Sequence, residues 1–265
     1  MRHKLIALGS IAVLTFMLAP IGGAYPQERH VEARVDRDMP EREDINQSYV
    51  LNPGARVELS VISGPVDVET ISGNTAEVHI VRMGETRTDL DCYKIAIENT
   101  PDSLVIRHRQ ERTDECQSIR SRQRVTLRLP RNVDLKLNAI SGPVKIGEID
   151  GTLKLSGISG RVEVAHSALG YSDISGISGV LTITIPRLSE RGLRVSGISG
   201  RVELRLASDL NADLNVSGIN GDVNAAAPNV TINKVGHSNF AGKVGAGGSV
   251  ISVSGISGSV TFRGE

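Results

Sequence analysis

The chain has 265 residues, and its 30 basic and 30 acidic side chains give a formal net charge of zero. A neutral chain has no overall field to gather nucleic acid or an anionic membrane, and four Tyr, three Phe and no Trp leave few rings for stacking on bases or sugars. This length suffices for one large all-β domain, although length alone also permits two.

Residues 1–24 have the organisation of a secretory signal peptide. A basic start at Arg2 and Lys4 precedes an almost entirely apolar run, and Gly22, Gly23 and Ala24 supply small residues for cleavage. An uncleaved membrane anchor is the alternative, but the apolar run is shorter than the roughly 20 residues that a spanning helix needs. We therefore expect an exported protein, periplasmic or at the cell surface, with no transmembrane segment after signal removal.

Residues 25–44 are dense in Arg, Glu and Asp with hardly an apolar side chain. Such a segment cannot bury enough surface to offset its ordering entropy, so we predict a flexible tether. From residue 45 to 265 the sequence predicts a single β-solenoid domain. Its first clear strand signal is the alternation of Val57, Leu59 and Val61.

Residues 84–124 interrupt this domain and are predicted to form an irregular excursion. A strand-like run at 78–81 precedes it, and two more, at 93–97 and 103–106, lie within it. Cys92 and Cys116 are the chain's two cysteines, and in an oxidising compartment they predict a disulfide. A metal site is the poorer interpretation, because two thiols with no nearby His or Cys at ligand spacing cannot complete a tetrahedral shell. The excursion also carries a candidate binding surface for acidic glycans or lipid headgroups, for which a solvated loop is the alternative: Arg107, Arg109, Arg112, Arg120, Arg122 and Arg124.

The rest of the chain repeats the phrase Val/Leu-Ser-Gly-Ile-Ser-Gly-x-Val. The first five of its central isoleucines follow one another at intervals of 18 to 21 residues, and the full set is Ile140, Ile158, Ile177, Ile198, Ile219 and Ile256, with a remote copy at Ile62. A fixed period near twenty residues is typical of a solenoid, whose units bury their apolar faces by stacking.

Each repeat contains two short strands, because apolar residues alternate with polar ones on both sides of the phrase. The glycines suit corners between these strands, where positive φ or close backbone approach is needed. Stacked repeats place isoleucine over isoleucine and serine over serine, so the sequence predicts parallel pairing, a buried isoleucine ladder and hydroxyl ladders.

Three stretches resemble a bacterial putative-adhesin family of β-strand-repeat domains whose function is unknown: the opening at 52–61, the entry at 125–135 and the Ser-Gly-x-Val-x-Val ladder that follows. The likeness covers roughly residues 50 to 265, and the related autotransporter-head, or GIN, domains look similar in their repeat. The resemblance implies a right-handed parallel β-helix, an extracytoplasmic location and a role in adhesion or at the envelope. It offers no catalytic residues, and the Arg-rich excursion departs from the simplest family pattern.

No cofactor, metal or nucleic-acid partner is predicted. A serine nucleophile needs Gly-x-Ser-x-Gly on a strand-to-helix turn, whereas these serines recur in an all-β repeat, and the histidines lack ligand spacing. We therefore expect a non-enzymatic binding or scaffolding module with an unidentified protein or glycan partner. The alternative is a carbohydrate-active β-helix enzyme, either a polysaccharide lyase or a hydrolase, with candidate carboxylates Asp173, Glu190, Asp209, Asp213 and Asp222.

Two expectations concern the last repeats. The asparagines between Asn211 and Asn233 recur every four or five residues and predict a stacked amide ladder. The ladder then runs into 260–263, so we expect an open terminal edge there, available for self-association or strand addition.

Overall fold

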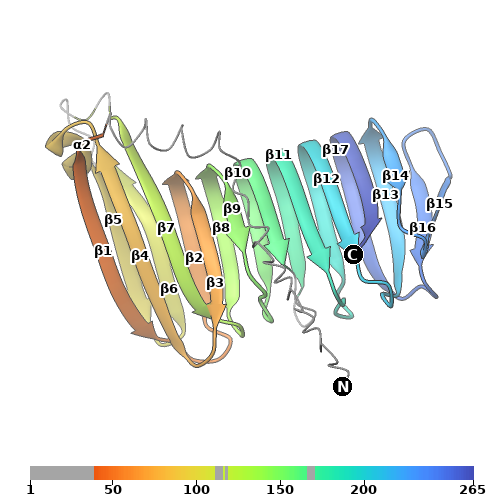
Figure 1. Cartoon of the computed structure of the whole chain (residues 1–265), viewed down its shortest axis with the longest axis horizontal. Helices are drawn as coiled ribbons and strands as arrows, with labels where there is room; N and C mark the ends of the chain where they lie inside the picture. Colours follow the sequence, from red (N-terminus) through yellow and green to blue (C-terminus); the bar gives the residue numbers. More distant parts are fainter. Residues whose placement is uncertain (1–38, 111–115, 117–118, 166–170) are drawn as a thin grey trace, which may run out of the picture. The chain divides into compact units, whose positions relative to one another are not determined.

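The computed structural model describes residues 39–110, 116, 119–165 and 171–265 (Figure 1). These residues belong to one compact unit, 39–265. The predicted signal peptide, most of the predicted tether and Arg112 lie outside the described residues.

The described residues form a 17-stranded mixed sheet, so the all-β prediction is confirmed. Its elements are β1 (Glu41–Val50), β2 (Arg56–Ser63), β3 (Val66–Ile71), β4 (Thr75–Gly84), α2 (Arg87–Cys92), β5 (Tyr93–Thr100), β6 (Ser103–Gln110), β7 (Ser121–Pro130), β8 (Asp134–Ser141), β9 (Val144–Ile146), β10 (Leu153–Ala165), β11 (Ser172–Ile185), β12 (Leu193–Leu206), β13 (Ala212–Asn220), β14 (Val223–Ala225), β15 (Val230–Lys234), β16 (Phe240–Val244) and β17 (Ser249–Gly264).

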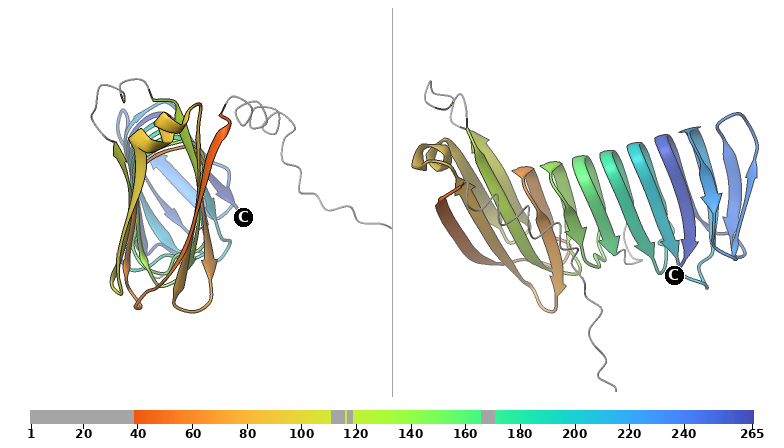
Figure 2. Two further views of the ribbon diagram at one scale, coloured as in Figure 1. Left: turned by 90° about the vertical axis from the view of Figure 1, so that its left-hand side faces the viewer. Right: turned by 45° about the horizontal axis from the view of Figure 1, so that its top comes forward.

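The strands are arranged in two layers that share one apolar interior (Figure 2). The first layer runs β5-β6-β2-β8, then through the first halves of β10, β11, β12 and β17, to β13-β16-β15. The second layer runs β1-β4-β7-β3-β9, then through the second halves of the same long strands, to β14. The long strands turn from one layer to the other at the Ser-Gly-Ile-Ser-Gly phrase.

The repeated phrases pair in parallel and in register. Ile158 lies between Ile140 and Ile177, and the serines on both sides of Ile177 are level with those beside Ile198. These isoleucines are each 1% exposed, so they form a buried column at the corner. Because the repeats carry identical residues at identical places, this register buries the apolar side chains of the phrase in each rung.

The order of the last rungs differs from the sequence order. β17 lies between β12 and β13, and Ile256 separates Ile198 from Ile219. Stacking in sequence order would place Ile198 next to Ile219, and the structure differs from that order. The predicted open edge at 260–263 is wrong, because these residues pair with β12 on one side and, as far as Phe262, with β14 on the other.

The second half of β12 explains why β17 takes this place. It buries Val202, Leu204 and Leu206, and β17 pairs with it over its whole length, supplying the fully buried Val260 and Phe262. β14 has three residues and offers a much shorter partner. Apolar burial therefore favours β17 as the neighbour of β12.

The second glycine of the phrase permits close stacking of the corners. A Cβ atom on Gly200 would lie 1.9 Å from the carbonyl oxygen of Gly179, and one on Gly258 would lie 1.8 Å from that of Gly200. Both contacts are far inside van der Waals distance, so only glycine fits this column.

The N-terminal end of the unit is built from antiparallel strands. β1 pairs with β4, β4 with β7, and β5 with β6. Much of the predicted irregular excursion is therefore regular structure, and β1 begins at Glu41, inside the range predicted as a tether. Residues 41–44 are charged but still belong to β1. The strand is held in place because its later side chains Ile45 and Tyr49 pack against the core.

Candidate binding surface

The outward side of the second layer carries a continuous polar surface that the repeat creates. Because side chains alternate along a strand, the register brings one outward residue from each rung into a row: Asp67, Lys145, Glu163, Thr182, Glu203 and Thr261. Acidic, basic and hydroxyl groups thus follow one another along the layer. We call this row and its neighbours the second-layer face.

A shallow depression of about 400 Å³ lies on this face over β3, β9 and β10 to β12. Its polar lining includes Asp67, Glu69, Lys145, Glu163 and Arg205. The surface is hollow here because Gly147 and Ala165, also in the lining, project little or nothing outward.

The charges in the depression are only partly neutralised. Burial raises the pKa of Asp67, the neighbouring Glu69 raises it further, and Lys145 opposes both effects. Among the described residues Asp67, Lys145 and Glu163 make no ion pair or side-chain hydrogen bond with each other or with any other side chain. Arg205 is already paired with Glu203 at 2.8 Å. Among the described lining residues, the depression therefore presents the Asp67 and Glu163 carboxylates as free acceptors beside the free Lys145 ammonium, which suits a ligand rich in hydroxyl groups.

A second depression of about 440 Å³ lies on β1, β4 and β7, and Glu77, His79 and Arg128 are in its lining. Arg128 contacts Glu69 at 2.9 Å and Glu77 at 3.4 Å. Arg128 thereby joins a residue of the first depression, Glu69, to a residue of the second, Glu77. Its hydrogen bond to Glu69 is the main cause that raises the pKa of Arg128. The two hollows are neighbouring parts of one face.

The predicted arginine surface is divided between the layers. Arg107 and Arg109 lie on β6 in the first layer, whereas Arg122 and Arg124 lie on β7 in the second. Arg107 pairs with Glu98, and Arg120 pairs with Glu85 at 2.8 Å. The arginines that the structure describes are therefore not gathered into one patch, because the chain changes layers between β6 and β7.

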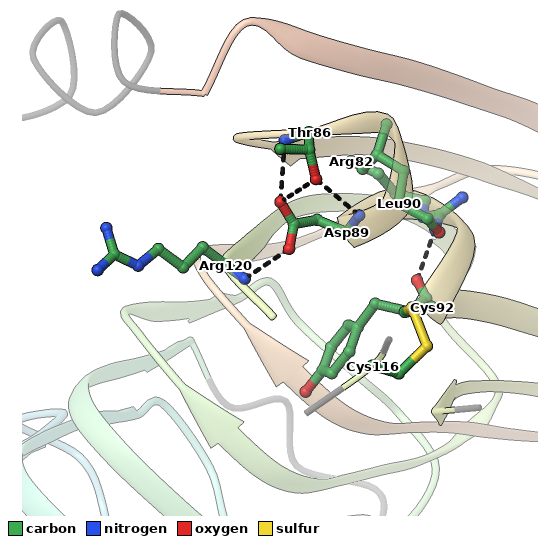
Figure 3. The surroundings of a disulfide bond; sticks show 8 residues. Arg82, Thr86, Asp89, Leu90, Cys92, Cys116 and Arg120 are labelled. Atoms are coloured by element: carbon green, nitrogen blue, oxygen red, sulfur yellow. Dashed lines mark hydrogen bonds between the residues drawn. A yellow bond between two sulfur atoms is a disulfide. The ribbon is translucent and has the colours of Figure 1, made fainter. Parts of the chain in front are cut away.

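Cys92 and Cys116 form a disulfide at the end of α2 (Figure 3). Thr86 caps this helix: its hydroxyl accepts from the Asp89 amide at 3.2 Å, and the Asp89 carboxylate accepts from the Thr86 amide at 2.9 Å. The other Asp89 oxygen accepts from the Arg120 amide at 3.0 Å. Burial opposes ionisation of Asp89, but these hydrogen bonds outweigh it and leave its pKa below the usual value.

Arg82 is a buried side chain at the same end of the unit. Its guanidinium donates to the Leu90 carbonyl (Figure 3). It is also bonded to the Tyr93 carbonyl at 2.5 Å and to the Glu43 carboxylate. Burial lowers its pKa, although Glu43 opposes this shift. Together with the disulfide, Arg82 ties β1, β4, α2 and β5 into one end structure.

The remaining sequence candidates are dispersed. Asp173 and Asp213 lie in the first layer, on the opposite side from Glu163 and Glu203. Asp222 follows a corner, and Glu190 and Asp209 lie in connections between strands. Within the described ranges no group of three His, Cys, Asp or Glu side chains is placed to hold a metal ion.

The predicted asparagine ladder is not formed. Asn215, Asn220 and Asn224 lie opposite Ser252, Ser257 and Thr261 of the inserted β17. Asn211 instead accepts from the Ala246 amide at 2.7 Å, and Asn229 donates to the Ala207 carbonyl at 3.3 Å. These side chains stabilise turns.

The sequence alone does not single out Asp67 and Lys145, because they lie far apart in the chain and meet only through the β3–β9 pairing. The alternation of polar and apolar residues in the sequence predicts that both side chains point outward. It does not predict which strands pair with each other. In the part of the chain that is described, no helix is long and apolar enough to cross a membrane.

No family model and no curated protein sequence matches this chain. Solved structures with some likeness include a putative cell adhesion protein from Clostridium sporogenes (TM-score 0.42, 11% identity, covering 84% of this chain and 100% of that one). A putative adhesin from Bacteroides fragilis has a TM-score of 0.32 and 9% identity, covering 84% and 98%. A putative lipid binding protein from Parabacteroides distasonis has a TM-score of 0.26 and 8% identity, covering 84% and 94%.

Proposed function

We propose that this chain is an exported, non-enzymatic right-handed parallel β-helix that serves as an adhesin-like binding or scaffolding module of the cell envelope. The observation that carries the proposal is the second-layer face, where in-register rungs hold charged and hydroxyl groups in fixed rows over two open depressions. An open, rigid and polar surface suits contact with an extended ligand such as a glycan. A sheet holds its outward side chains at fixed spacings, so little entropy is lost when the ligand binds.

Export is supported by the signal-like residues 1–24 and by the Cys92–Cys116 disulfide, since disulfides persist in oxidising compartments. Periplasmic or cell-surface residence follows, with any segment between the signal and β1 acting as a tether. Fractionation of cells that express the tagged chain, with alkylation of free thiols before lysis, tests this. A cytoplasmic protein with both thiols alkylated would contradict export.

Binding is tested by retention of the purified protein on its own envelope glycan fraction. A second-layer variant with Asp67→Asn and Glu163→Gln should lose retention, because both free carboxylates of the depression are then neutral. The matched control is Asp173→Asn with Asp213→Asn, which neutralises two carboxylates on first-layer strands. Equal retention of both variants and of the wild type would exclude the second-layer face as the binding surface.

The alternative of a carbohydrate-active enzyme is favoured by one observation, the raised pKa of Asp67 in the depression that also holds Glu163. A raised pKa is a property of general acids. Incubation with envelope polysaccharides, followed by assay of new reducing ends and of unsaturated products, distinguishes the two functions. Turnover that disappears in Asp67→Asn would establish the enzyme.

A further inference from the structure

Three strands share one register at the C-terminal end of the described unit. Residues Val195, Val253 and Val216 are level with one another, as are the serines that follow them. β17 pairs in parallel with β12 on one side and with β13 and β14 on the other. The edges of β12 and β13 that face each other across β17 therefore carry the same pattern.

β17 does not lie next to the strand that precedes it in the sequence. It follows β16, which lies on the far side of β13, and residues 245–248 carry the chain back past the start of β13. Residues 207–211 connect β12 to β13, and this connection is no longer than residues 186–192, which join the directly adjacent β11 and β12. The place of β17 is thus a slot between two strands that the chain connects directly.

The connection into β17 is a hinge of sequence Gly245-Ala246-Gly247-Gly248. All three glycines have positive φ, of 54°, 89° and 153°. Three of its four backbone amides donate hydrogen bonds: Gly245 to the Asn229 carbonyl at 2.9 Å, Ala246 to the Asn211 side-chain oxygen at 2.7 Å and Gly247 to the Val244 carbonyl at 3.1 Å. Glycines tolerate many backbone conformations, so this segment can open at little steric cost.

The occupant of the slot must be a strand of one particular pattern. The inward side chains of β17 are at most 1% exposed: Ile251, Val253, Ile256, Val260 and Phe262. An empty slot would expose the facing core of β12, and a strand of another pattern would leave gaps. A second copy of this chain offers the same β17.

We propose that β17 exchanges between two copies of the chain, so that each copy's slot between β12 and β13 is filled by the other's β17. Every strand pairing and buried contact of the slot is retained in such a dimer, and only the conformation of residues 245–248 changes. The surface that associates is therefore the slot itself, and the partner is a second copy. A closed two-fold dimer follows because both copies donate and accept the same strand.

The test uses a pair of thiols across the slot. Glu203 on β12 and Thr261 on β17 are paired outward residues, and both native cysteines are held in the disulfide. The variant Glu203→Cys with Thr261→Cys is partly unfolded in mild denaturant, returned to buffer at several protein concentrations and treated with a short bis-maleimide. Exchange predicts cross-linked dimers on a denaturing gel. Their ratio to internally linked monomer should rise about tenfold for a tenfold rise in concentration while dimer is the minor species.

The matched control carries Glu163→Cys with Thr182→Cys, which are paired in the same row on β10 and β11. These rungs stay within one chain in the exchanged dimer, so only internal cross-links are expected. Exclusively internal cross-links in the slot variant at every concentration would overturn the proposal. Equal dimer yields from the two variants would overturn it too, because the association would then not depend on β17.

A second variant removes Gly247 and Gly248, so that the hinge is too short to return β17 to its own slot. Exchange predicts at least a tenfold loss of monomer relative to the wild type in light scattering after size exclusion. A folded, monomeric deletion variant would contradict strand exchange independently of any cross-linking.

Discussion

Val61 and Gly157 occupy the same place in the repeated phrase, directly before isoleucines of one column, and share one left-handed backbone conformation, with φ of 58° and 63°. The rungs from Gly157 onward place glycine there, whereas the second rung has Ala139, with φ of 54°, and the first rung has the β-branched Val61. Left-handed backbone costs a residue with a side chain roughly 1–2 kcal/mol, and β-branched residues suffer most.

Val61→Gly should therefore raise the free energy of unfolding by about 1 kcal/mol, because relief of strain exceeds the added entropy of the unfolded chain. Val61 is 42% exposed, so little packing is lost. Val250→Gly is the control, because Val250 is 47% exposed in a strand and is not at positive φ. It should lower stability. Urea unfolding of both variants checks the prediction, and a less stable Val61→Gly would show that this position is not strained.

The two glycines of one phrase should respond differently to alanine. Gly200→Ala places Cβ 1.9 Å from the Gly179 carbonyl oxygen and should cost about 3 kcal/mol or more, through steric overlap and a backbone conformation restricted to glycine. A Cβ on Gly197 would come no closer than 3.6 Å to its neighbours. Gly197→Ala should therefore cost only about 1–2 kcal/mol. Equal losses in thermal unfolding would contradict the close stacking of the second glycine column.

The buried isoleucines provide a test of rung order. Ile198 is covered by rungs on both sides and is 1% exposed, whereas Ile219 is 6% exposed and lies beyond β17. Ile198→Ala should cost about 2–5 kcal/mol, and Ile219→Ala should cost less. Hydrogen exchange should show that the first change loosens β17 as well as β11. Protection of β17 unchanged in Ile198→Ala would argue against their pairing.

The sequence predicts the register of the rungs better than their order. The serines and isoleucines of the phrase specify which residues are level, and Ile140, Ile158 and Ile177 do stack as their spacing predicts. Ile198, Ile219 and Ile256 head nearly identical phrases, so no local pattern says which two are neighbours. Which strand lies next to β12 depends on the pairing and apolar burial that β17 provides along the whole length of β12. The depression around Asp67 and Lys145 was missed for the same reason, because it depends on pairing between distant strands.

The Cys92–Cys116 disulfide should contribute about 3 kcal/mol, since it closes a loop with a sequence separation of 24 residues. Replacing both cysteines by alanine should lower the unfolding free energy by about that amount and increase hydrogen exchange in α2 first. A reductant should destabilise the wild type and leave the double variant unchanged. Peptide mapping without reductant should find the linked pair, and free thiols at both positions would refute the pairing.

His108 should make stability depend on pH between about 6.5 and 4. Burial, helped by the positive charge of Arg82, lowers its pKa to about 4. Its Nε2 atom is buried and has no hydrogen-bond partner among the described residues, so a proton added there would find no acceptor among them. As the pH falls through this window the unfolded chain binds a proton that the folded chain does not, and stability is lost. The Asp89 carboxylate, whose pKa is also lowered, loses its contribution at more acidic pH. Chemical denaturation at pH 7, 5.5 and 4.5 should show a steeper loss in the wild type than in His108→Gln. Parallel pH profiles for the two proteins would mean that His108 titrates alike in the folded and unfolded states.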